Sequence, residues 1–294
     1  MQKTLKRIYN ELRYEGKMVK IIVEIGTNHM GDVKVAKQII DIAVDCGADI
    51  VKLQRKNVEK IYTKKFLDSY LESPWGTTQR EMRLHREFSD KQFKEISNYC
   101  KKKKIPWFVS CWDIESQIHM RKFKTKYNKV ASAMIIHKEL LEEIAKEEKY
   151  TFISTGMSEM KDIENAVKIF KKYQCPFELM HCNSAYPIAD NEANLKLILT
   201  LKNKFKCKVG YSGHEIGATN VSVPAVMMGA TSIERHVTVS RTNYGYDQSA
   251  SLEKEGLRKL VRDIRILDKI MGDGKKKIWA SEKPNIKKLR QILT

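Results

Sequence analysis

Short apolar segments and amphipathic, helix-like segments alternate eight times along this chain of 294 residues, and no other feature restricts its fold as strongly. Segments 20–26 and 177–182 are typical of the apolar kind, and segment 33–46 is typical of the amphipathic kind. Consecutive parallel strands need long crossovers, which helices supply. Eight strand–helix units within about 250 residues predict a (β/α)8 barrel, also called a TIM barrel.

The predicted elements follow one another with short connections in all but one place. The strands are expected at 20–26, 49–54, 106–112, 129–133, 150–155, 177–182, 207–212 and 231–238, and the helices at 33–46, 89–103, 114–123, 137–146, 159–172, 192–203, 218–228 and 253–271. The exception is segment 55–86, an irregular stretch punctuated by Pro, Gly and Ser. It is too long for an idle loop, so we expect it to be functional.

We expect the chain to have three parts: a short arm or hairpin at 1–18, the barrel at 19–272 and a C-terminal tail at 273–294. A doubly wound open sheet is the competing architecture. It is disfavoured because no glycine-rich dinucleotide-binding turn follows the first strand and the sequence contains no P-loop motif.

Lysine and arginine number 55 against 36 aspartate and glutamate residues, which gives a formal net charge of +19. Such a surplus favours anionic partners, which are nucleic acid, an acidic surface or phosphorylated small molecules. The basic runs 101–104, 171–172 and 275–277 lie apart in helix-like segments, and no nucleic-acid-binding motif accompanies them. No apolar run approaches the ~20 residues of a membrane span. We therefore expect small-molecule substrates, with neither nucleic acid nor a membrane as partner.

The six cysteines, at positions 46, 100, 111, 175, 182 and 207, form no Cys-x-x-Cys pair and have irregular spacing. Segment 1–18 is charged and polar and lacks the apolar core of a secretory signal peptide. This combination is typical of a reducing compartment, and we expect a cytoplasmic location.

Polar side chains occur at the carboxyl ends of the predicted strands. In a barrel these ends meet at one rim, where catalytic residues gather. In chain order the candidates are Glu24, Lys52, Gln54, Ser110, Lys129, Ser132, Ser154, Ser184, Tyr186, Ser212, His214, Glu234, His236 and Asp247. A single residue of this kind is often structural, but so many charges at one rim are costly to bury without a bound anion or metal.

The residue types at this rim suit particular ligands. Two lysines together with hydroxyls and backbone N–H groups suit a phosphate or a carboxylate. Two neutral imidazoles leave most of the coordination sphere of a divalent ion open, which suits a Lewis acid rather than a structural metal. A carboxylate such as Glu24 suits proton transfer or the binding of a substrate hydroxyl.

Six short motifs carry a resemblance to a known family. They are VEIGTNH at 23–29, GADIVKLQ at 47–54, STGM at 154–157, His181-Cys182 with Ser184 and Tyr186-Pro187, GYSGH at 210–214 and IERH at 233–236. In this order, each at the end of a strand, they resemble the catalytic barrel of the sialic acid synthases, the N-acetylneuraminate synthase family. The resemblance extends from about residue 19 to residue 272.

The resemblance implies the condensation of phosphoenolpyruvate with an open-chain aldose, which yields a 2-keto-3-deoxy sugar acid and phosphate by cleavage of a C–O bond. It implies that His214 and His236 hold a divalent metal, Mn²⁺ or Mg²⁺. Phosphoenolpyruvate would be bound by Lys52, Ser110, Lys129, Ser132, Ser154, Ser184 and Ser212, and the sugar by Gln54, Tyr186 and Asp247. Glu24 and Glu234 would be acid or base candidates. The family also tends to dimerise, which implies a possible homodimer.

Three departures from the family pattern concern the sugar side. We expect the chain to lack the C-terminal antifreeze-like domain, which in this family supplies an arginine to the sugar site of the partner subunit. The usual Ser-Asp-His-Thr reads Ser212-Gly213-His214-Glu215 here, and the acidic residue expected soon after Ser132 is absent from 133–135. These departures leave the acceptor open, between N-acetylmannosamine and a related aldose.

Two other functions remain open from the residues. The first is a Schiff-base (class I) aldolase on the same barrel, with Lys52 or Lys129 as the amine. The second is a non-catalytic, basic binding protein with a degenerate barrel. Borohydride trapping in the presence of pyruvate separates the aldolase from the synthase. The joint presence of both lysines and both imidazoles disfavours the binding protein.

Overall fold

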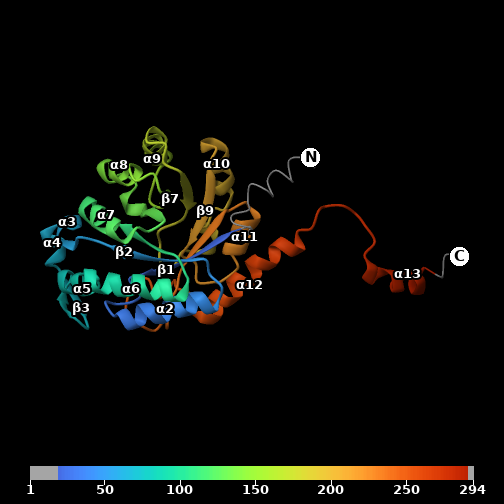
Figure 1. Ribbon diagram of the computed structural model, residues 1–294, viewed down its shortest axis with the longest axis horizontal. Helices are drawn as coiled ribbons and strands as arrows, with labels where there is room; N and C mark the ends of the chain where they lie inside the picture. Colours follow the sequence, from blue (N-terminus) through green and yellow to red (C-terminus); the bar gives the residue numbers. More distant parts are fainter. Residues whose placement is uncertain (1–18, 291–294) are drawn as a thin grey trace.

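Eight parallel strands close into a barrel in the computed structural model, which describes residues 19–290 (Figure 1). The strands are β1 (Lys20–Gly26), β2 (Ile50–Arg55), β5 (Trp107–Cys111), β6 (Tyr127–Val130), β7 (Tyr150–Ser154), β8 (Phe177–His181), β9 (Lys208–Gly213) and β10 (Ser232–His236). Each pairs with the next one along the chain, and β10 closes the ring on β1. The predicted TIM barrel is confirmed, whereas the arm predicted at 1–18 lies outside the described residues.

Helices connect successive strands and cover the outside of the barrel (Figure 1). They are α2 (Val33–Asp45), α6 (Asp90–Lys103), α7 (Ile114–Met120), α8 (Lys138–Ala145), α9 (Met160–Lys172), α10 (Lys196–Phe205), α11 (Ser222–Met227) and α12 (Lys254–Ile270). Local sequence fixes the start of α6, because the Ser89 hydroxyl accepts from the Gln92 backbone N–H and the Gln92 side chain accepts from the Ser89 backbone N–H. This capping box satisfies backbone donors that the first helical turn leaves free.

Alternation along each strand divides its side chains between two environments. Val23 and Ile25 of β1 pack in the layer between strands and helices, whereas Ile22 and Glu24 point into the barrel. The amino-terminal half of the interior is filled by Ile22, Ile50, Phe108, Tyr127, Phe152 and Met180. Burial of each such side chain stabilises the fold by about 1.5–3 kcal/mol. This apolar layer lies next to the polar residues that occupy the carboxyl-terminal half of the barrel interior.

The fourth predicted strand, at 129–133, is displaced in the structure. It is β6 and ends at Val130, and Ser132 begins the short 3-10 helix η2 (Ser132–Met134). The Ser132 hydroxyl accepts from the backbone N–H of Gly156 at 3.2 Å, so this segment follows the rim instead of continuing the sheet. Ser132 therefore lies above the end of its strand rather than on it.

Two helices begin four residues later than predicted, at Lys196 and Ser222. Segment 192–203 contains the end of η3 (Asp190–Glu192) and then α10, because Asn194 between them has a φ of 41°, which a continuous right-handed helix excludes. Segment 218–228 contains only α11, since the residues before it form a turn. The carbonyl of Gly217 in this turn accepts from the Arg235 guanidinium at 2.9 Å.

Segment 55–86, expected to be irregular, contains three short helices and a hairpin. They are α3 (Val58–Ile61), α4 (Lys64–Leu67), β3 (Tyr70–Ser73), β4 (Gly76–Thr78) and α5 (Gln79–His85), gathered at one end of the molecule (Figure 1). Trp75 at the hairpin turn stacks on His85 with 4.6 Å between ring centroids, and the Tyr244 hydroxyl donates to the carbonyl of Glu72. The hairpin thus packs against the connection that follows β10.

The segment predicted as a C-terminal tail, 273–294, contains η4 (Ala280–Glu282) and α13 (Lys283–Leu289). It extends away from the barrel beyond α12 (Figure 1). Within residues 19–290, no helix combines the length and the apolar character that crossing a membrane requires.

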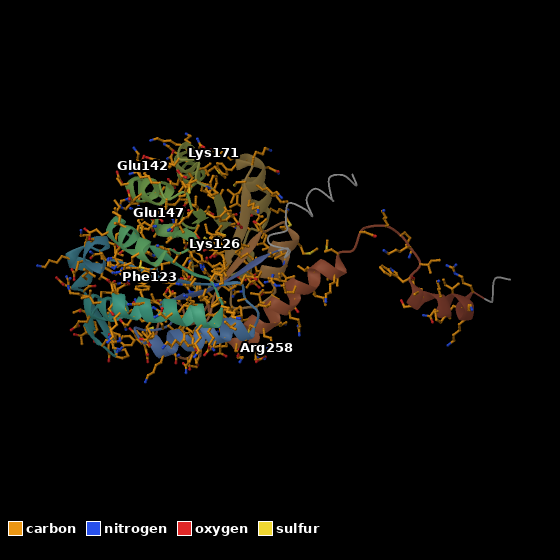
Figure 2. All side chains as sticks on the ribbon, viewed as in Figure 1. Phe123, Lys126, Glu142, Glu147, Lys171 and Arg258 are labelled. Atoms are coloured by element: carbon orange, nitrogen blue, oxygen red, sulfur yellow. The ribbon has the colours of Figure 1, made fainter. Side chains whose placement is uncertain are left out.

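A carboxylate outside the barrel joins helices to the sheet (Figure 2). Glu147, between α8 and β7, accepts from Gln117 Nε2 at 2.8 Å and from Asn128 Nδ2 at 3.2 Å, and it pairs with Arg121 Nε at 3.0 Å. These partners come from α7, β6 and the turn η1 (Arg121–Phe123). Although burial opposes ionisation, the donors hold the pKa of Glu147 below its ordinary value.

Candidate active site

The predicted site residues lie at the carboxyl ends of the strands or in the connections that follow. Glu24 is on β1, Lys52 and Gln54 on β2, Ser110 on β5, Lys129 on β6, Ser154 on β7, Ser212 on β9, and Glu234 and His236 on β10. Ser132, Ser184, Tyr186, His214 and Asp247 lie in the connections after β6, β8, β9 and β10. All of them belong to the same rim of the barrel.

A buried carboxylate, Glu234, lies between the two lysines. Lys52 Nζ is 2.8 Å from its Oε1, and Lys129 Nζ is 2.9 Å from its Oε2. The Ser212 hydroxyl also donates to Oε1, at 3.3 Å. The three charged side chains are almost fully buried, so each charge needs the others to offset its desolvation.

Burial and pairing shift the pKa values of this network in different directions. Burial disfavours the charged form of Lys52, but Glu234 and Glu24 outweigh it and raise the pKa of Lys52. Burial lowers the pKa of Lys129 despite Glu234, and the charge of Lys52 lowers it further. At Glu234 the two lysines outweigh burial and hold the pKa far below its ordinary value. Glu234 is therefore an anion that holds two cations rather than a proton donor near neutral pH.

Glu24 joins the same network from β1. Its Oε2 lies 3.1 Å from Lys52 Nζ, and Gln54 Nε2 donates to its Oε1 at 2.8 Å. In the sheet register Glu24 is paired with Lys52 on one side and with His236 on the other. Lys52 is thus shared by two carboxylates, and Glu24 connects it to the imidazole side of the rim.

The two predicted imidazoles lie side by side. The ring centroids of His214 and His236 are 5.6 Å apart, and Tyr186 stacks on His214 at 4.0 Å. His214 Nδ1 donates to the carbonyl of Asn183 at 2.5 Å, so its Nε2 carries the lone pair. Burial, and then the nearby His236, lower the pKa of His214 to about 3, which keeps this imidazole neutral. His236 Nδ1 is buried and has no hydrogen-bond partner within the described residues.

Asp247 is held beside His236 by the connection after β10. Its Oδ2 lies 3.9 Å from His236 Nδ1 and accepts from the Thr27 hydroxyl at 3.0 Å. Asn28 fixes this connection, because its amide donates to Ser251 Oγ, which in turn donates to the Asp247 carbonyl. Although burial opposes ionisation, His236 and the Thr27 hydroxyl hold the pKa of Asp247 below its ordinary value.

Glycine at position 156 lets two predicted serines approach the end of β7. A Cβ atom there would lie 2.9 Å from Ser132 Oγ and closer still to Ser184 Oγ. On β5, Ser110 Oγ is buried and has no hydrogen-bond partner in the described part of the chain. Hydroxyls and backbone N–H groups gathered in this way suit an oxyanion.

The sequence pattern gives no indication of the partner of a buried arginine that supports the rim. Arg235 points away from the barrel interior and pairs with Glu215 Oε1 at 2.8 Å. The Tyr211 hydroxyl donates to the other oxygen of this carboxylate at 3.0 Å. Alternation along β10 predicts that the Arg235 side chain points outward. It does not predict that Glu215 is its partner, because this contact forms only in the folded chain. Because these two residues adjoin His236 and His214, their ion pair fixes the backbone next to both imidazoles.

Fold and site together define a (β/α)8-barrel enzyme whose rim joins a lysine pair to an imidazole pair. The NeuB family model matches residues 39–276. The chain belongs to the NeuB family.

Named relatives agree with this family. The chain is 37% identical over 265 residues to N-acetylneuraminate-9-phosphate synthase of Mus musculus, a match that covers 89% of this chain and 74% of that protein. It is 38% identical over 283 residues to N,N'-diacetyllegionaminic acid synthase of Campylobacter jejuni, covering 94% and 84%. The crystal structure of N-acetylneuraminic acid (sialic acid) synthetase from Leptospira borgpetersenii superposes with a TM-score of 0.79 and 35% identity, covering 94% of this chain and 92% of that chain. The predicted family and the predicted phosphoenolpyruvate-dependent sugar-acid synthase are confirmed.

Proposed function

We propose that the rim of this barrel binds phosphoenolpyruvate and an open-chain aldose together and joins them into a 2-keto-3-deoxy sugar acid with release of phosphate. The observation that carries this proposal is the Lys52–Glu234–Lys129 network beside the two imidazoles. A pair of cations suits the phosphate and the carboxylate of one substrate. The two imidazoles would hold a metal, which would supply Lewis-acid chemistry toward the carbonyl group of the other substrate.

Lys52 and Lys129 would bind the anionic groups of phosphoenolpyruvate. Both ammonium groups are held in place by Glu234, so they need little rearrangement when the substrate arrives. The proposed hydroxyl donors to the same substrate are Ser110, Ser132, Ser154, Ser184 and Ser212. Support comes from Ser110, whose hydroxyl has no partner in the described residues, and from the approach of two serines around Gly156.

The aldose would lie between the imidazoles and the connection after β10. Asp247 would accept hydrogen bonds from sugar hydroxyls, and Tyr186 would offer both a ring face and a hydroxyl. Gln54, which donates to Glu24, would complete the sugar site. Glu24 would bind an acceptor hydroxyl or transfer a proton. Glu234 is less suited to this role, because its carboxylate is paired with both lysines.

The imidazole pair fits a divalent metal. His214 presents a neutral Nε2, and His236 Nδ1 is unpartnered within the described residues. No group of three or more His, Cys, Asp or Glu side chains suited to a metal occurs within residues 19–290. Two nitrogen donors leave the remaining positions to water and substrate, as catalytic metals require. When bound, Mn²⁺ or Mg²⁺ would act as a Lewis acid on the aldehyde oxygen.

The proposed reaction forms one C–C bond and breaks one C–O bond. The C3 carbon of phosphoenolpyruvate adds to the aldehyde carbon, and the aldehyde oxygen takes a proton to become a hydroxyl. Water adds to C2, and phosphate departs from the tetrahedral centre with its bridging oxygen, which leaves the 2-keto group. Lys52 and Lys129 would stabilise the negative charge of the phosphate, and Glu24 would move the proton.

Release of inorganic phosphate tests the proposal. The protein is incubated with phosphoenolpyruvate, Mn²⁺ or Mg²⁺, and one of a panel of five- and six-carbon aldoses, with or without an N-acyl group or a terminal phosphate. We expect phosphate to form only when both substrates are present, in equal amount to a 2-keto acid. Release without any aldose, or no release with the whole panel, contradicts the proposal.

A Schiff-base aldolase is the second candidate because of one observation. Burial lowers the pKa of Lys129, which favours the nucleophilic amine. Borohydride reduction in the presence of pyruvate would then trap a covalent adduct on Lys129, whereas the synthase forms none. The ion pair of Lys129 with Glu234, at 2.9 Å, opposes loss of the proton, so we favour the synthase.

Three further properties stay predictions. They are a location in the cytoplasm, assembly as a homodimer, and small molecules rather than nucleic acid or membrane as partners. The free state of all six cysteines supports the first. Sedimentation of the purified protein tests the second.

A further inference from the structure

A cluster of buried polar side chains lies behind the imidazole pair, on the helix side of the sheet. It consists of Tyr211 on β9, Glu215 in the connection after β9, Ser222 at the start of α11 and Arg235 on β10, and we call it the outer cluster. None of the four residues is more than 1% exposed. The proposed reaction gives them no role, although burying such groups is costly.

Glu215 is at the centre of the outer cluster. Its Oε1 accepts from Arg235 Nη1 at 2.8 Å and from the Ser222 hydroxyl at 2.7 Å, and its Oε2 accepts from the Tyr211 hydroxyl at 3.0 Å. Arg235 also donates to the backbone carbonyls of Glu215 and Gly217, to the second at 2.9 Å. One guanidinium group therefore ties the connection after β9 to strand β10.

Glycine at position 213 lets the Glu215 side chain fold back against the sheet. A Cβ atom at this position would overlap Glu215 Oε2 and would lie 2.7 Å from Cε1 of the Tyr211 ring. Any other residue would therefore push the carboxylate away from the Tyr211 hydroxyl. The chain on the amino-terminal side of His214 is thus fitted closely to the outer cluster.

Both imidazoles are joined to the outer cluster through the backbone. His214 directly precedes Glu215, and His236 directly follows Arg235. Gly213 and Arg235 are partners in the sheet register, so the chain reaches both imidazoles from adjacent points of the sheet. The His214 ring is also held by its own bond to a backbone carbonyl, whereas His236 Nδ1 has no hydrogen-bond partner within the described residues. The position of His236 therefore depends on the backbone that Arg235 fixes.

The spacing of the imidazoles matters because the proposed metal site takes one nitrogen from each. Their ring centroids are 5.6 Å apart. An ion held by two protein nitrogens must lie close to both, so a small rotation of either backbone would take one donor out of reach. Groups that orient metal ligands typically change metal affinity by about 10–100-fold when they are removed.

We propose that Arg235 is a positioning residue, which acts through Glu215 to fix the spacing of the imidazole pair and thereby sets its affinity for a divalent ion. This inference rests on the proposed function, because it assumes a metal at the imidazoles. A buried ion pair often adds little stability compared with apolar side chains of the same volume, so a positional role accounts better for its presence. Arginine suits this role, since its planar guanidinium binds a carboxylate and two carbonyls at once.

Calorimetry with Mn²⁺ alone tests the proposal on three variants whose folding is checked by circular dichroism. Arg235→Met should raise the Kd for Mn²⁺ at least about tenfold. Tyr211→Phe, which removes one donor to Glu215 and keeps the ring, should raise it about threefold. The matched control is Arg121→Met, which takes a cation from the Glu147 carboxylate outside the barrel, a side chain that is 7% exposed. This control should retain the wild-type Kd.

An unchanged Kd in folded Arg235→Met or Tyr211→Phe protein would overturn the proposal. An equal loss of affinity in Arg121→Met would overturn it as well, because lower stability alone would then explain the effect. If Arg235→Met does not fold, Tyr211→Phe decides. If wild-type protein binds no Mn²⁺, the proposed metal site fails instead, and crystal structures of the wild type and Tyr211→Phe decide the positioning role. A changed separation of the two imidazoles then supports it, and an unchanged separation contradicts it.

Discussion

The Lys52 ammonium lies 2.8 Å from the Glu234 carboxylate although both side chains are almost completely buried. Glu24 lies 3.1 Å from the same ammonium, so one cation serves two carboxylates. A charge left without its partner in such surroundings costs several kcal/mol. Lys52 therefore connects the stability of the barrel to the proposed binding of an anionic substrate.

We predict that Lys52→Met lowers the free energy of unfolding by about 3–5 kcal/mol, because Glu24 and Glu234 lose a shared cation. It should also raise KM for phosphoenolpyruvate at least about tenfold, since one substrate-binding charge is lost. Urea unfolding measures the first effect, and titration of phosphate release measures the second. Lys65→Met on α4 is the exposed control. An unchanged KM would make Lys52 a structural residue only.

The imidazole pair predicts a metal requirement that depends on His236. His236→Ala should abolish metal-stimulated phosphate release and leave the fold intact, as circular dichroism would report. Chelation should abolish phosphate release by the wild-type protein. Added Mn²⁺ should restore this activity in the wild type but not in the variant. Calorimetry with Mn²⁺ alone gives a readout independent of turnover. Metal-stimulated activity of the variant at the wild-type level would show that the metal is held elsewhere.

The ion pair of Arg235 with Glu215 predicts non-additive effects on stability. Arg235→Met should lower the free energy of unfolding by about 3–5 kcal/mol, because it leaves the Glu215 carboxylate buried and unpaired. Adding Glu215→Gln should recover part of this loss, since the amide carries no charge to desolvate. Chemical denaturation of the two single variants and the double variant measures the coupling. A double variant as unstable as the sum of the single variants contradicts the prediction.

Lys56 predicts a pH dependence of stability. Its pKa in the folded protein is about 8, below the ordinary 10.5, because burial disfavours the ammonium and Arg86 and Arg83 add to this, while Glu87 and Asp247 oppose it. Between these two pH values the unfolded chain binds more protons at this residue, so the contribution of Lys56 to the free energy of unfolding rises with pH. Lys56→Met should therefore have a higher Tm than wild type below pH 8 and lose this advantage toward pH 10.5. A difference in Tm that does not change with pH contradicts this.

The barrel and the rim are predictable from the sequence because both depend on local patterns. Strand alternation places Lys52 and Glu234 inside, and parallel strands bring their carboxyl ends to one rim. The pairing of these side chains depends on the register of the closed sheet, which no single strand specifies. The sequence therefore predicts Lys52 and Lys129 as substrate ligands but does not indicate that Glu234 holds both.

The boundaries and residues that the sequence does not predict depend on contacts between distant segments or on backbone conformation. The helix predicted from 192 is interrupted by the φ of 41° at Asn194, a conformation that no periodicity reports. Arg86 lies in a segment without helical or strand periodicity, and only the contact through Thr27 brings it to Asp247. Its place near Asp247, a residue of the proposed sugar site, becomes visible once β1 and the connection after β10 are packed together.

The bridging oxygen of phosphoenolpyruvate provides the most direct test of the central claim, that this rim joins an aldose to phosphoenolpyruvate by cleavage of the C–O bond. Phosphoenolpyruvate that carries oxygen-18 at the bridging position is turned over with an active aldose, and the released phosphate is examined by mass spectrometry. The account predicts that the released phosphate carries the label, because it departs from C2 with the bridging oxygen. Unlabelled phosphate, the product of P–O cleavage, would contradict it.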